Sequence, residues 1–313
     1  MADRFGDQTL ASRIRENLTL PVIAAPMFLV SGPDLVIAAS RAGIIGAIPA
    51  LNQRTTEGFE SWLEQIKQAT AGAPYAVNLI VHDSNGRLEE DLTVVVRHRA
   101  PLVIASIGSP APVVERVRAY GGLVFSDVAS VWHARRAAEA GVDGLILLCA
   151  GAGGNTGWLN PFAFLAEVRG FWDGPVALAG AISRGSYVHL AEEMGADFAF
   201  VGTPFIAARE SLAPEAYRSM LVESGADDIV LTAAVTGIPA NMLRRSLEKS
   251  GYVPRKGASA RFDLNAEMEA LRAWRDIWSA GHGVGDVNAV ESLADIVDRF
   301  AADYRRARQR RSA

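Results

Sequence analysis

The sequence predicts a (β/α)8 TIM barrel followed by a C-terminal helical and loop extension. Eight short runs are apolar throughout, as expected for parallel strands that are buried on both faces. Amphipathic segments lie between them, and several end in glycine, as in RAG, EAG and EMG, where a left-handed cap residue is favoured. A doubly wound open sheet is the alternative. Eight units, with no GxGxxG after the first run, favour the barrel.

The predicted strands follow one another through the first 203 residues. In chain order they are 20–27, 44–50, 75–80, 102–106, 123–128, 144–150, 175–180 and 198–203. Segments such as 55–70 and 131–141 have apolar residues three or four positions apart, which predicts helices between the strands.

The alternation stops after residue 203. Helices are expected at 204–225 and 265–280, and loops at 232–243 and 279–287. We therefore divide the chain into a barrel core, residues 1–209, and an extension, residues 210–313, which packs on the barrel.

Composition excludes several classes of protein. The net charge of -4 provides no basic field for nucleic acid. The single cysteine, Cys149, excludes an internal disulfide and a cysteine-based zinc site, which fits a reducing compartment. Cys149 follows an apolar run, so we expect a small buried hydrophobe rather than a nucleophile. No His, Cys or carboxylate cluster has the spacing of metal ligands, so no metal is predicted.

The chain shows no targeting or membrane segment. Its N-terminus lacks the apolar region of a secretory signal, and no apolar run reaches the ~18 residues of a membrane span. We expect a soluble, cytoplasmic protein without a membrane partner, whose exposed barrel helices would support a homodimer.

In a TIM barrel the active site lies at the C-terminal ends of the strands. The candidate residues at these ends are Ala25, Pro26, Met27, Asn78, Asp127, Ala152, Gly153, Gly154 and Asn155. His82 lies just beyond Asn78 and is either a catalytic group or a surface histidine. Asp127 either hydrogen-bonds a cofactor hydroxyl or a nearby amide, or caps the following helix.

Small residues after the last two strands suggest a phosphate site. Gly180 and Ala181 follow the seventh strand, Gly202 and Thr203 follow the eighth, and a helix is expected after each pair. Free backbone N–H groups and helix N-termini bind anions without Lys or Arg. Ordinary short turns are the alternative. Beside the glycine-rich stretch CAGAGGNTG (149–157), the combination favours a flat cofactor with a phosphate, such as FMN.

The motifs VIAAPM, AGAGGNTG, VALAGAIS, GADFAFVGTPFIA and WSAGHGVG resemble the nitronate monooxygenase family, which is related to FMN-dependent enoyl-acyl-carrier-protein reductases. The resemblance implies an FMN-containing barrel. It implies that Pro26, Met27 and the glycines of 151–154 face the isoalloxazine and that Asn78 hydrogen-bonds the flavin. It also implies that the phosphate is held by Gly180, Ala181, Gly202 and Thr203.

Asn155 departs from the family pattern. Members that oxidise nitronates typically have histidine there, as base or substrate anchor. An imidazole exchanges a proton near neutral pH, whereas a carboxamide only donates and accepts hydrogen bonds. We therefore expect neutral nitroalkanes, which must lose a proton, to be poor substrates. His82 and His282 are the histidines considered as substitutes, and His133 is expected to be a partly exposed helix residue.

Three functions remain open from the sequence. The first is FMN-dependent oxidation of alkyl nitronates with O2, in which Asn155 and His82 orient the substrate. The second is an FMN-dependent reductase that uses NAD(P)H to reduce enoyl thioesters or quinones. The third is a flavin-binding protein without turnover.

Overall fold

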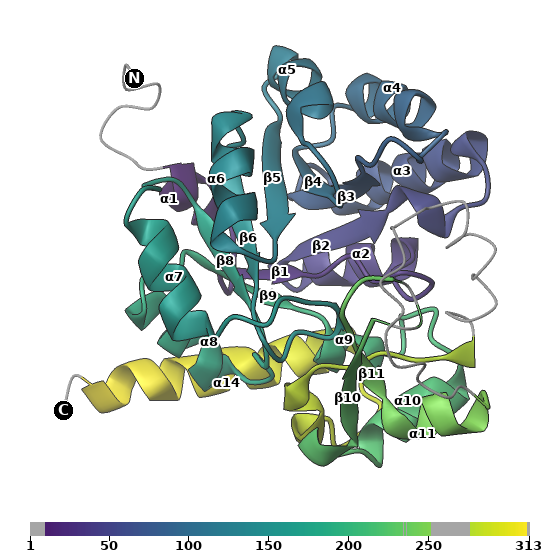
Figure 1. Ribbon diagram of the computed structural model, residues 1–313, viewed down its shortest axis with the longest axis vertical. Helices are drawn as coiled ribbons and strands as arrows, with labels where there is room; N and C mark the ends of the chain where they lie inside the picture. The colour runs from purple at the N-terminus through teal and green to yellow at the C-terminus, as the bar shows by residue number, and fades with distance from the viewer. Residues whose placement is uncertain (1–9, 234, 236, 252–275, 312–313) are drawn as a thin grey trace.

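Eight parallel strands form a closed barrel, as predicted (Figure 1). The computed structural model describes residues 10–233, 235, 237–251 and 276–311. The barrel strands are β1 (Val22–Ala24), β2 (Ile45–Pro49), β3 (Tyr75–Ile80), β4 (Leu102–Ser106), β5 (Leu123–Val128), β6 (Gly144–Leu148), β8 (Val176–Ala179) and β9 (Phe198–Val201). Closure comes from parallel pairing of β1 with β9, in which Ile23 lies opposite Phe200. This closure excludes the open sheet.

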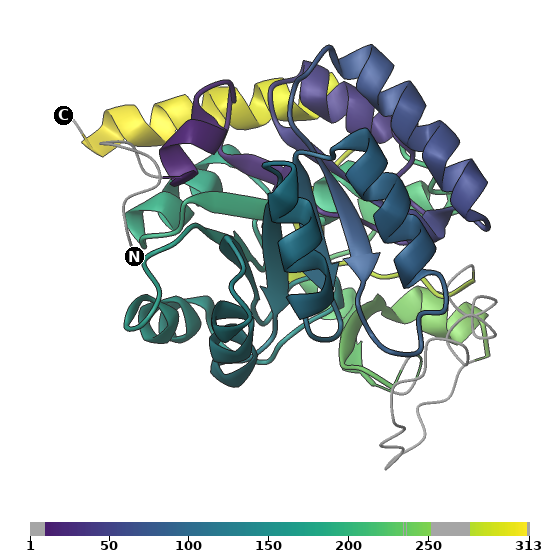
Figure 2. The same cartoon turned by 90° about the horizontal axis from the view of Figure 1, so that it is seen from above.

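Helices surround the strands (Figure 2). The helices of the wall are α1 (Leu10–Arg15), α2 (Pro33–Arg41), α3 (Thr56–Thr70), α4 (Leu88–His98), α5 (Ala111–Ala119), α6 (Val131–Glu139), α7 (Pro161–Arg169), α8 (Gly185–Glu193) and α14 (Leu293–Arg311). Hydroxyl caps define some of their starts, since the side chains of Thr55 and Ser130 accept hydrogen bonds from the first turns of α3 and α6. Among the described residues, no helix is both long and apolar enough to span a membrane.

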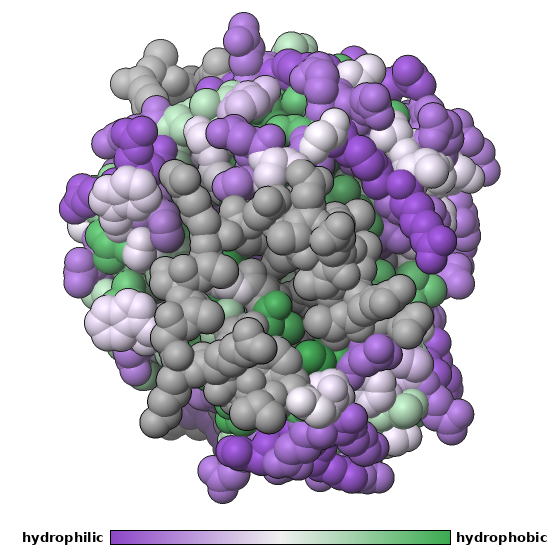
Figure 3. All heavy atoms as spheres, turned by 45° about the vertical axis from the view of Figure 1, so that its right-hand side comes forward, coloured by the Kyte–Doolittle hydropathy of each residue, from purple (hydrophilic) through white to green (hydrophobic). Residues whose placement is uncertain are grey.

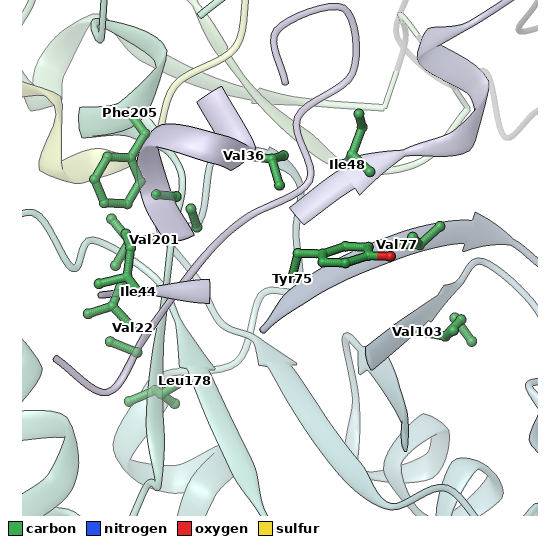
Figure 4. Close-up of a cluster of buried hydrophobic side chains, with 14 of the residues drawn as sticks. Val22, Val36, Ile44, Ile48, Tyr75, Val77, Val103, Leu178, Val201 and Phe205 are labelled. Atoms are coloured by element: carbon green, nitrogen blue, oxygen red, sulfur yellow. The ribbon is translucent and has the colours of Figure 1, made fainter. Parts of the chain in front are cut away.

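Alternate strand residues build two hydrophobic layers. Outward-facing residues such as Val22 and Val201 pack with helix residues such as Val36 and Phe205 (Figure 4). Inward-facing residues fill the barrel, where the rings of Phe125 and Phe198 meet edge to face with centroids 6.4 Å apart.

One glycine makes this interior packing possible. A Cβ atom at Gly144, the first residue of β6, would lie under 3.0 Å from the Phe125 ring. The absent side chain is therefore what allows a large aromatic ring to lie inside the barrel.

The extension contains a small sheet that the sequence analysis missed. Strands β10 (Ile229–Thr232) and β11 (Ala240–Leu243) form an antiparallel pair, so the predicted loop at 232–243 is wrong at its two ends, where residues 232 and 240–243 belong to strands. β11 also pairs with β7 (Gly154–Asn155), which lies in the β6–α7 loop. Strands of two to four residues have too little alternation to be recognised, and β7 and β11 are also far apart in the sequence.

The helices and the second loop predicted for the extension agree with the structure only in part. The predicted helix at 204–225 is two helices, α9 (Thr203–Ile206) and α10 (Glu215–Val222), separated by a non-helical segment. After β11 comes the short helix α11 (Arg244–Lys249). Most of the helix expected at 265–280 lies outside the described residues. The loop at 279–287 includes a 3-10 turn, η3 (His282–Asp286).

The last helix, α14, belongs to the barrel wall. It packs against α8, α2 and α9, and it lies along the outside of the strands in Figures 1 and 2. A Cβ at Gly185 would lie under 3.0 Å from the Phe300 carbonyl oxygen, so the backbones of α8 and α14 touch directly. The Asp303 carboxylate accepts a hydrogen bond of 2.7 Å from the Ser186 N–H. The division of the chain at residue 209 stays a prediction.

Candidate active site

A cavity of about 1000 Å³ opens at the C-terminal ends of the strands. It is at the upper end of the range for ligand-binding clefts. The structure brings all but one of the candidate residues to its wall: Ala25, Pro26, Met27, Asn78, Asp127, Ala152, Gly153, Gly154, Asn155, Gly180, Ala181, Gly202 and Thr203. The exception is His82, which is not among the described residues that line the cavity.

The turn after β1 is held rigidly. The Asn52 side-chain amide donates to the carbonyl oxygens of Met27 and Ser31, at 3.0 and 2.8 Å, and its oxygen accepts from the Leu29 N–H at 2.9 Å. Leu29 has a φ of 58°, a left-handed conformation that these bonds stabilise. Pro26 and Met27 are thereby fixed against the cavity. Asn52 is a positioning residue that the sequence analysis missed, because nothing in the sequence links it to a turn 25 residues away.

A hydrogen-bonded chain crosses three neighbouring strand ends. The Asn78 Nδ2 donates to Ser106 Oγ at 2.7 Å and to the Ile104 carbonyl oxygen at 3.1 Å. The Ser106 hydroxyl in turn donates to Asp127 Oδ2 at 2.6 Å. All three polar side chains line the cavity. This hydrogen-bonded network therefore fixes one amide and one carboxyl group at the cavity wall.

Asp127 is a carboxyl group without a cationic partner among the described residues. Burial raises its pKa to about 6, and the Ser106 hydrogen bond opposes this shift without cancelling it. The side chain is only half-buried by exposed area because one side faces the cavity. The helix that follows is capped by Ser130, whose Oγ accepts from the His133 N–H at 3.1 Å, so the capping hypothesis for Asp127 is wrong.

The glycine-rich stretch packs tightly against the extension. The Asn241 side chain on β11 donates to the Ala152 carbonyl oxygen at 2.7 Å. A Cβ at Gly153 would lie under 3.0 Å from the Gly281 nitrogen, so this backbone approaches the 279–283 segment with no room for a side chain. Gly154, with a φ of 66°, leads into β7. The glycines thus bring Asn155 to the cavity wall through backbone contacts.

Asn155 presents an unpaired polar atom. Its side chain lines the cavity, and its Oδ1 is buried without a hydrogen-bond partner within the described part of the chain. An unsatisfied buried polar atom costs about 1–3 kcal/mol, so such an atom in a cavity points to a ligand. Cys149, by contrast, is fully buried, and burial raises the pKa of its thiol to about 12, as expected for an inert residue.

The turns after β8 and β9 offer unpaired donors. In the described structure no acceptor faces the backbone N–H groups of Ala181, Gly202 and Thr203. Ala181 has a φ of 54°, and a Cβ at Gly202 would make only ordinary contacts with Met27 and Ala25. These groups suit an anion. The α8 N-terminus is less available, because Asp303 already accepts from its first turn.

The histidines occupy three different environments. The His82 Nδ1 lies 2.7 Å from Ser84 Oγ, on the loop beyond β3. The His282 ring packs beside Gly151, outside the described cavity lining, while its backbone N–H donates to the Gly151 carbonyl oxygen at 2.9 Å. His133 lines an outer part of the cavity, near the start of α6. Its place after β5, at the end of the barrel where active sites lie, was the signal that could have identified His133 as a residue of the cavity wall.

The extension adds aromatic residues to the cavity wall. The rings of Tyr217 and Trp278 stack with centroids 5.0 Å apart, and both residues line the cavity. The Tyr217 hydroxyl donates to the Ser279 carbonyl oxygen, which fixes the pair. In Figure 3 a few hydrophobic residues are visible near the middle of the face, with hydrophilic ones above and below. Only the fold shows that these extension residues meet the barrel mouth.

The combination fits a flavin with a phosphate group. Unpaired N–H groups lie at the β8 and β9 turns, and an apolar wall is provided by Pro26, Met27 and backbone. Polar side chains of Asn78 and Asp127 lie across the mouth. In the described residues, no group of three or more His, Cys, Asp or Glu side chains could hold a metal ion.

Comparison with known proteins gives a consistent result. A dehydrogenase from Rhodococcus jostii that acts on a 5-hydroxy-7a-methyl-1-oxo-octahydro-1H-indene-4-carboxyl-CoA is 28% identical over 77% of this chain, which spans 68% of that relative. The nitroalkane oxidase structure from Streptomyces ansochromogenes has a TM-score of 0.81 and 27% identity, covering 95% of this chain and 99% of that one. FabK from Thermotoga maritima shares the fold, with a TM-score of 0.82, 22% identity and coverages of 97% and 98%.

The family model for nitronate monooxygenase matches residues 84–274, which include strands β4 to β9 and the glycine-rich loop. This match covers more than half of the chain, and it agrees with the barrel and with the residues gathered at its mouth. The chain therefore belongs to the nitronate monooxygenase family of oxidoreductases.

Proposed function

We propose that this protein is an FMN-dependent oxidoreductase that oxidises alkyl nitronates with O2. The observation that carries the proposal is the unpaired Asn155 amide at the wall of a cavity suited to a flavin. The similarity to the nitroalkane oxidase from Streptomyces ansochromogenes, at 27% identity, supports a nitro compound as the class of substrate.

The residues that would hold FMN come from opposite sides of the mouth. Ala181, Gly202 and Thr203 would donate backbone N–H groups to the phosphate, and Asn78 and Asp127 would hydrogen-bond polar groups of the cofactor. Bound FMN would supply an acceptor for the electrons of the substrate and a route for them to oxygen.

Asn155 would orient the substrate without moving a proton. The oxygen and nitrogen of a carboxamide exchange places by rotation about χ2, so the buried position can present an acceptor or a donor. With the nitrogen there, the amide donates to a nitronate oxygen. A nitronate is already deprotonated, so its oxidation requires binding and orientation rather than a base.

Turnover of neutral nitroalkanes distinguishes a role of Asn155 in orienting the substrate from a role in base catalysis. A positioned base contributes roughly 10²–10⁴ in rate, and Asn155 provides none. We expect Asn155→His to raise turnover of a neutral nitroalkane at pH 7 by at least about 10², with turnover of the matching nitronate changed only a few-fold. Steady-state oxygen consumption with each substrate measures both. No gain with the neutral substrate would show that the missing imidazole is not the limitation.

A reductase is the second candidate, and Asp127 favours it. Reduction of an enoyl thioester requires a proton at the α-carbon, and a carboxyl group with a pKa of about 6 holds one part of the time near neutrality. The Rhodococcus relative also acts on a coenzyme A derivative. Consumption of NAD(P)H with an enoyl thioester, absent with a nitronate and O2, would identify the reductase.

A further inference from the structure

One short part of the extension lies against both turns that offer unpaired donors. At the turn after β9, the Gly281 N–H donates to the Thr203 hydroxyl oxygen at 2.9 Å. At the turn after β8, a Cβ added to Gly283 would lie 2.8 Å from both Cβ and Oγ of Ser183, and 3.1 Å from the Ala181 carbonyl oxygen. The 3-10 turn η3 and the glycine before it therefore contact both turns directly.

Asp286, the last residue of η3, binds two consecutive residues of the β8 turn. Its Oδ2 accepts hydrogen bonds from the Ser183 hydroxyl and, at 3.0 Å, from the Arg184 Nε. Its Oδ1 accepts from the Arg184 Nη2, which completes a bidentate ion pair. Burial opposes the ionisation of Asp286, yet the bonds from Arg184 and Ser183 outweigh it and lower the pKa below the ordinary 3.8. Charge-assisted bonds of this kind hold both side chains in one orientation.

Arg184 follows the β8 turn and would be an obvious cation for a phosphate. Its guanidinium is instead engaged by Asp286, and its central carbon lies 5.2 Å from the centroid of the Tyr187 ring. Arg184 is not among the described residues that line the cavity, whereas Ala181 and Ser183 are. The donors left for an anion at this turn are therefore neutral backbone groups, and their direction depends on how the turn is held.

The conformation of the β8 turn requires support. Ala181 has a φ of 54°, a left-handed conformation that is unfavourable for a residue with a Cβ. The Ser183 hydroxyl has one proton, and the Asp286 carboxylate is a closer acceptor for it than the Ala181 carbonyl oxygen at 3.4 Å. The hydroxyl therefore anchors the turn, and loss of Asp286 would allow the Ala181 N–H to turn away from an anion.

We propose that Asp286 is a positioning residue for the phosphate of the cofactor. It holds the β8 turn through Ser183 and Arg184, which keeps the Ala181 N–H available to the phosphate and the guanidinium away from it. Asp286 acts through the turn, since a carboxylate in contact with the phosphate would repel it. The inference rests on the proposed function only in taking FMN as the cofactor.

Comparison of FMN with riboflavin isolates the phosphate, because riboflavin differs only in lacking it. In Asp286→Ala the Kd of FMN, measured by fluorescence titration of the flavin-free protein, should rise about tenfold, as expected when one or two hydrogen bonds are lost. The Kd of riboflavin should change by less than about twofold. An equal change for both ligands would overturn the inference, because a merely structural residue affects both.

Two glycines of η3 provide a second test that leaves Asp286 in place. Gly283→Ala would press a Cβ against Ser183, whereas a Cβ at Gly285 would meet no atom within 4 Å. Gly283→Ala should weaken binding of FMN and spare riboflavin, and Gly285→Ala should leave both Kd values unchanged. Equal FMN affinities in the two variants would contradict a role for the contact between η3 and the β8 turn.

Variants of the ion pair separate support of the turn from control of a cation. Asp286→Asn keeps an acceptor for the Ser183 hydroxyl, and Arg184→Ala keeps the bond between Ser183 and Asp286. Both should lose less FMN affinity than Asp286→Ala. Tighter binding of FMN in Asp286→Ala, abolished when Arg184→Ala is added, would show that Asp286 only restrains a competing cation, and this would overturn the inference.

Asp143 is the control for a general loss of stability. Its side chain is 14% exposed, compared with 21% for Asp286, and it pairs with Arg118 at 3.0 Å. It directly precedes β6, at the opposite end of the barrel. Asp143→Ala should lower the Tm without changing the ratio of the two Kd values, and a shift in this ratio like that of Asp286→Ala would contradict the assigned role.

The proposed function is tested separately on the native protein. Native protein that binds FMN but is not bleached by an alkyl nitronate contradicts nitronate oxidation, whereas the role of Asp286 is decided by the Kd ratios alone. No measurable binding of FMN to the native protein would overturn the inference together with the assignment of the cavity.

Discussion

At the scale of single residues, Asp127 affects both the stability of the folded protein and the chemistry of the cavity. Its carboxyl group accepts one hydrogen bond, from Ser106, and no described cation compensates its burial. Ionisation of this group therefore costs free energy in the folded state. The cost is accepted at a position that faces the cavity, which is typical of a functional group.

Asp127→Asn should stabilise the protein above pH 6. The pKa of Asp127 is about 6 in the folded state, compared with 3.8 for the ordinary carboxyl group. Between these values the folded state binds more protons, so its free energy of unfolding falls as the pH rises, by roughly 3 kcal/mol in all. The amide keeps the bond from Ser106 and does not ionise. Denaturant unfolding should show a gain at pH 7.5 that largely disappears at pH 4.5, and an equal gain at both would contradict the assignment.

Gly144 tests the packing inside the barrel. In Gly144→Ala the new Cβ would overlap the Phe125 ring, so we expect a loss of about 1–3 kcal/mol in the free energy of unfolding. Gly86 is the control, because a Cβ there would meet no atom within 4 Å. Thermal or denaturant unfolding that ranks both alanine variants alike would show that the ring moves aside without cost.

At the scale of secondary structure, a strand could be predicted from the sequence when its apolar run was long enough to form a recognisable pattern. The barrel strands were predictable because each is an apolar run bounded by turns, and because the unit repeats eight times. β7, with two residues, carries no such pattern and exists only because β11 pairs with it. The hydrogen bonds from Asn52 to the turn after β1 and the stacking of Tyr217 on Trp278 were not predictable either, since each depends on contacts between distant segments.

The pairing of β11 with β7 should matter for the cofactor. Asn241→Ala removes the donor to the Ala152 carbonyl oxygen, a buried bond whose loss costs about 1–3 kcal/mol. We expect lower stability and weaker FMN binding, because the glycine-rich loop loses its support. Asn288→Ala, which removes an exposed bond to the Asp286 carbonyl oxygen, is the control. Fluorescence titration with FMN measures the effect, and equal affinities in both variants would argue against this support.

At the scale of the whole molecule, barrel and extension share one cavity. Strand ends supply the candidate flavin and substrate residues, whereas Tyr217 and Trp278 close part of the mouth from the extension. The positions of nearly all candidate residues at this cavity could be anticipated from the rule that barrel sites lie at strand C-termini. His82 shows the limit of that rule, because proximity in sequence to Asn78 did not bring it to the described cavity wall.

The most direct test of the proposed function is the visible flavin spectrum of the anaerobic protein before and after addition of an alkyl nitronate. We predict that the purified protein shows a flavin spectrum and that the nitronate bleaches it promptly, with recovery when oxygen is admitted. Asn155 would then suffice for nitronate oxidation without an imidazole. A flavin spectrum that the nitronate leaves unchanged would contradict the proposed function, and the absence of any flavin band after incubation with FMN would contradict the assignment of the cavity itself.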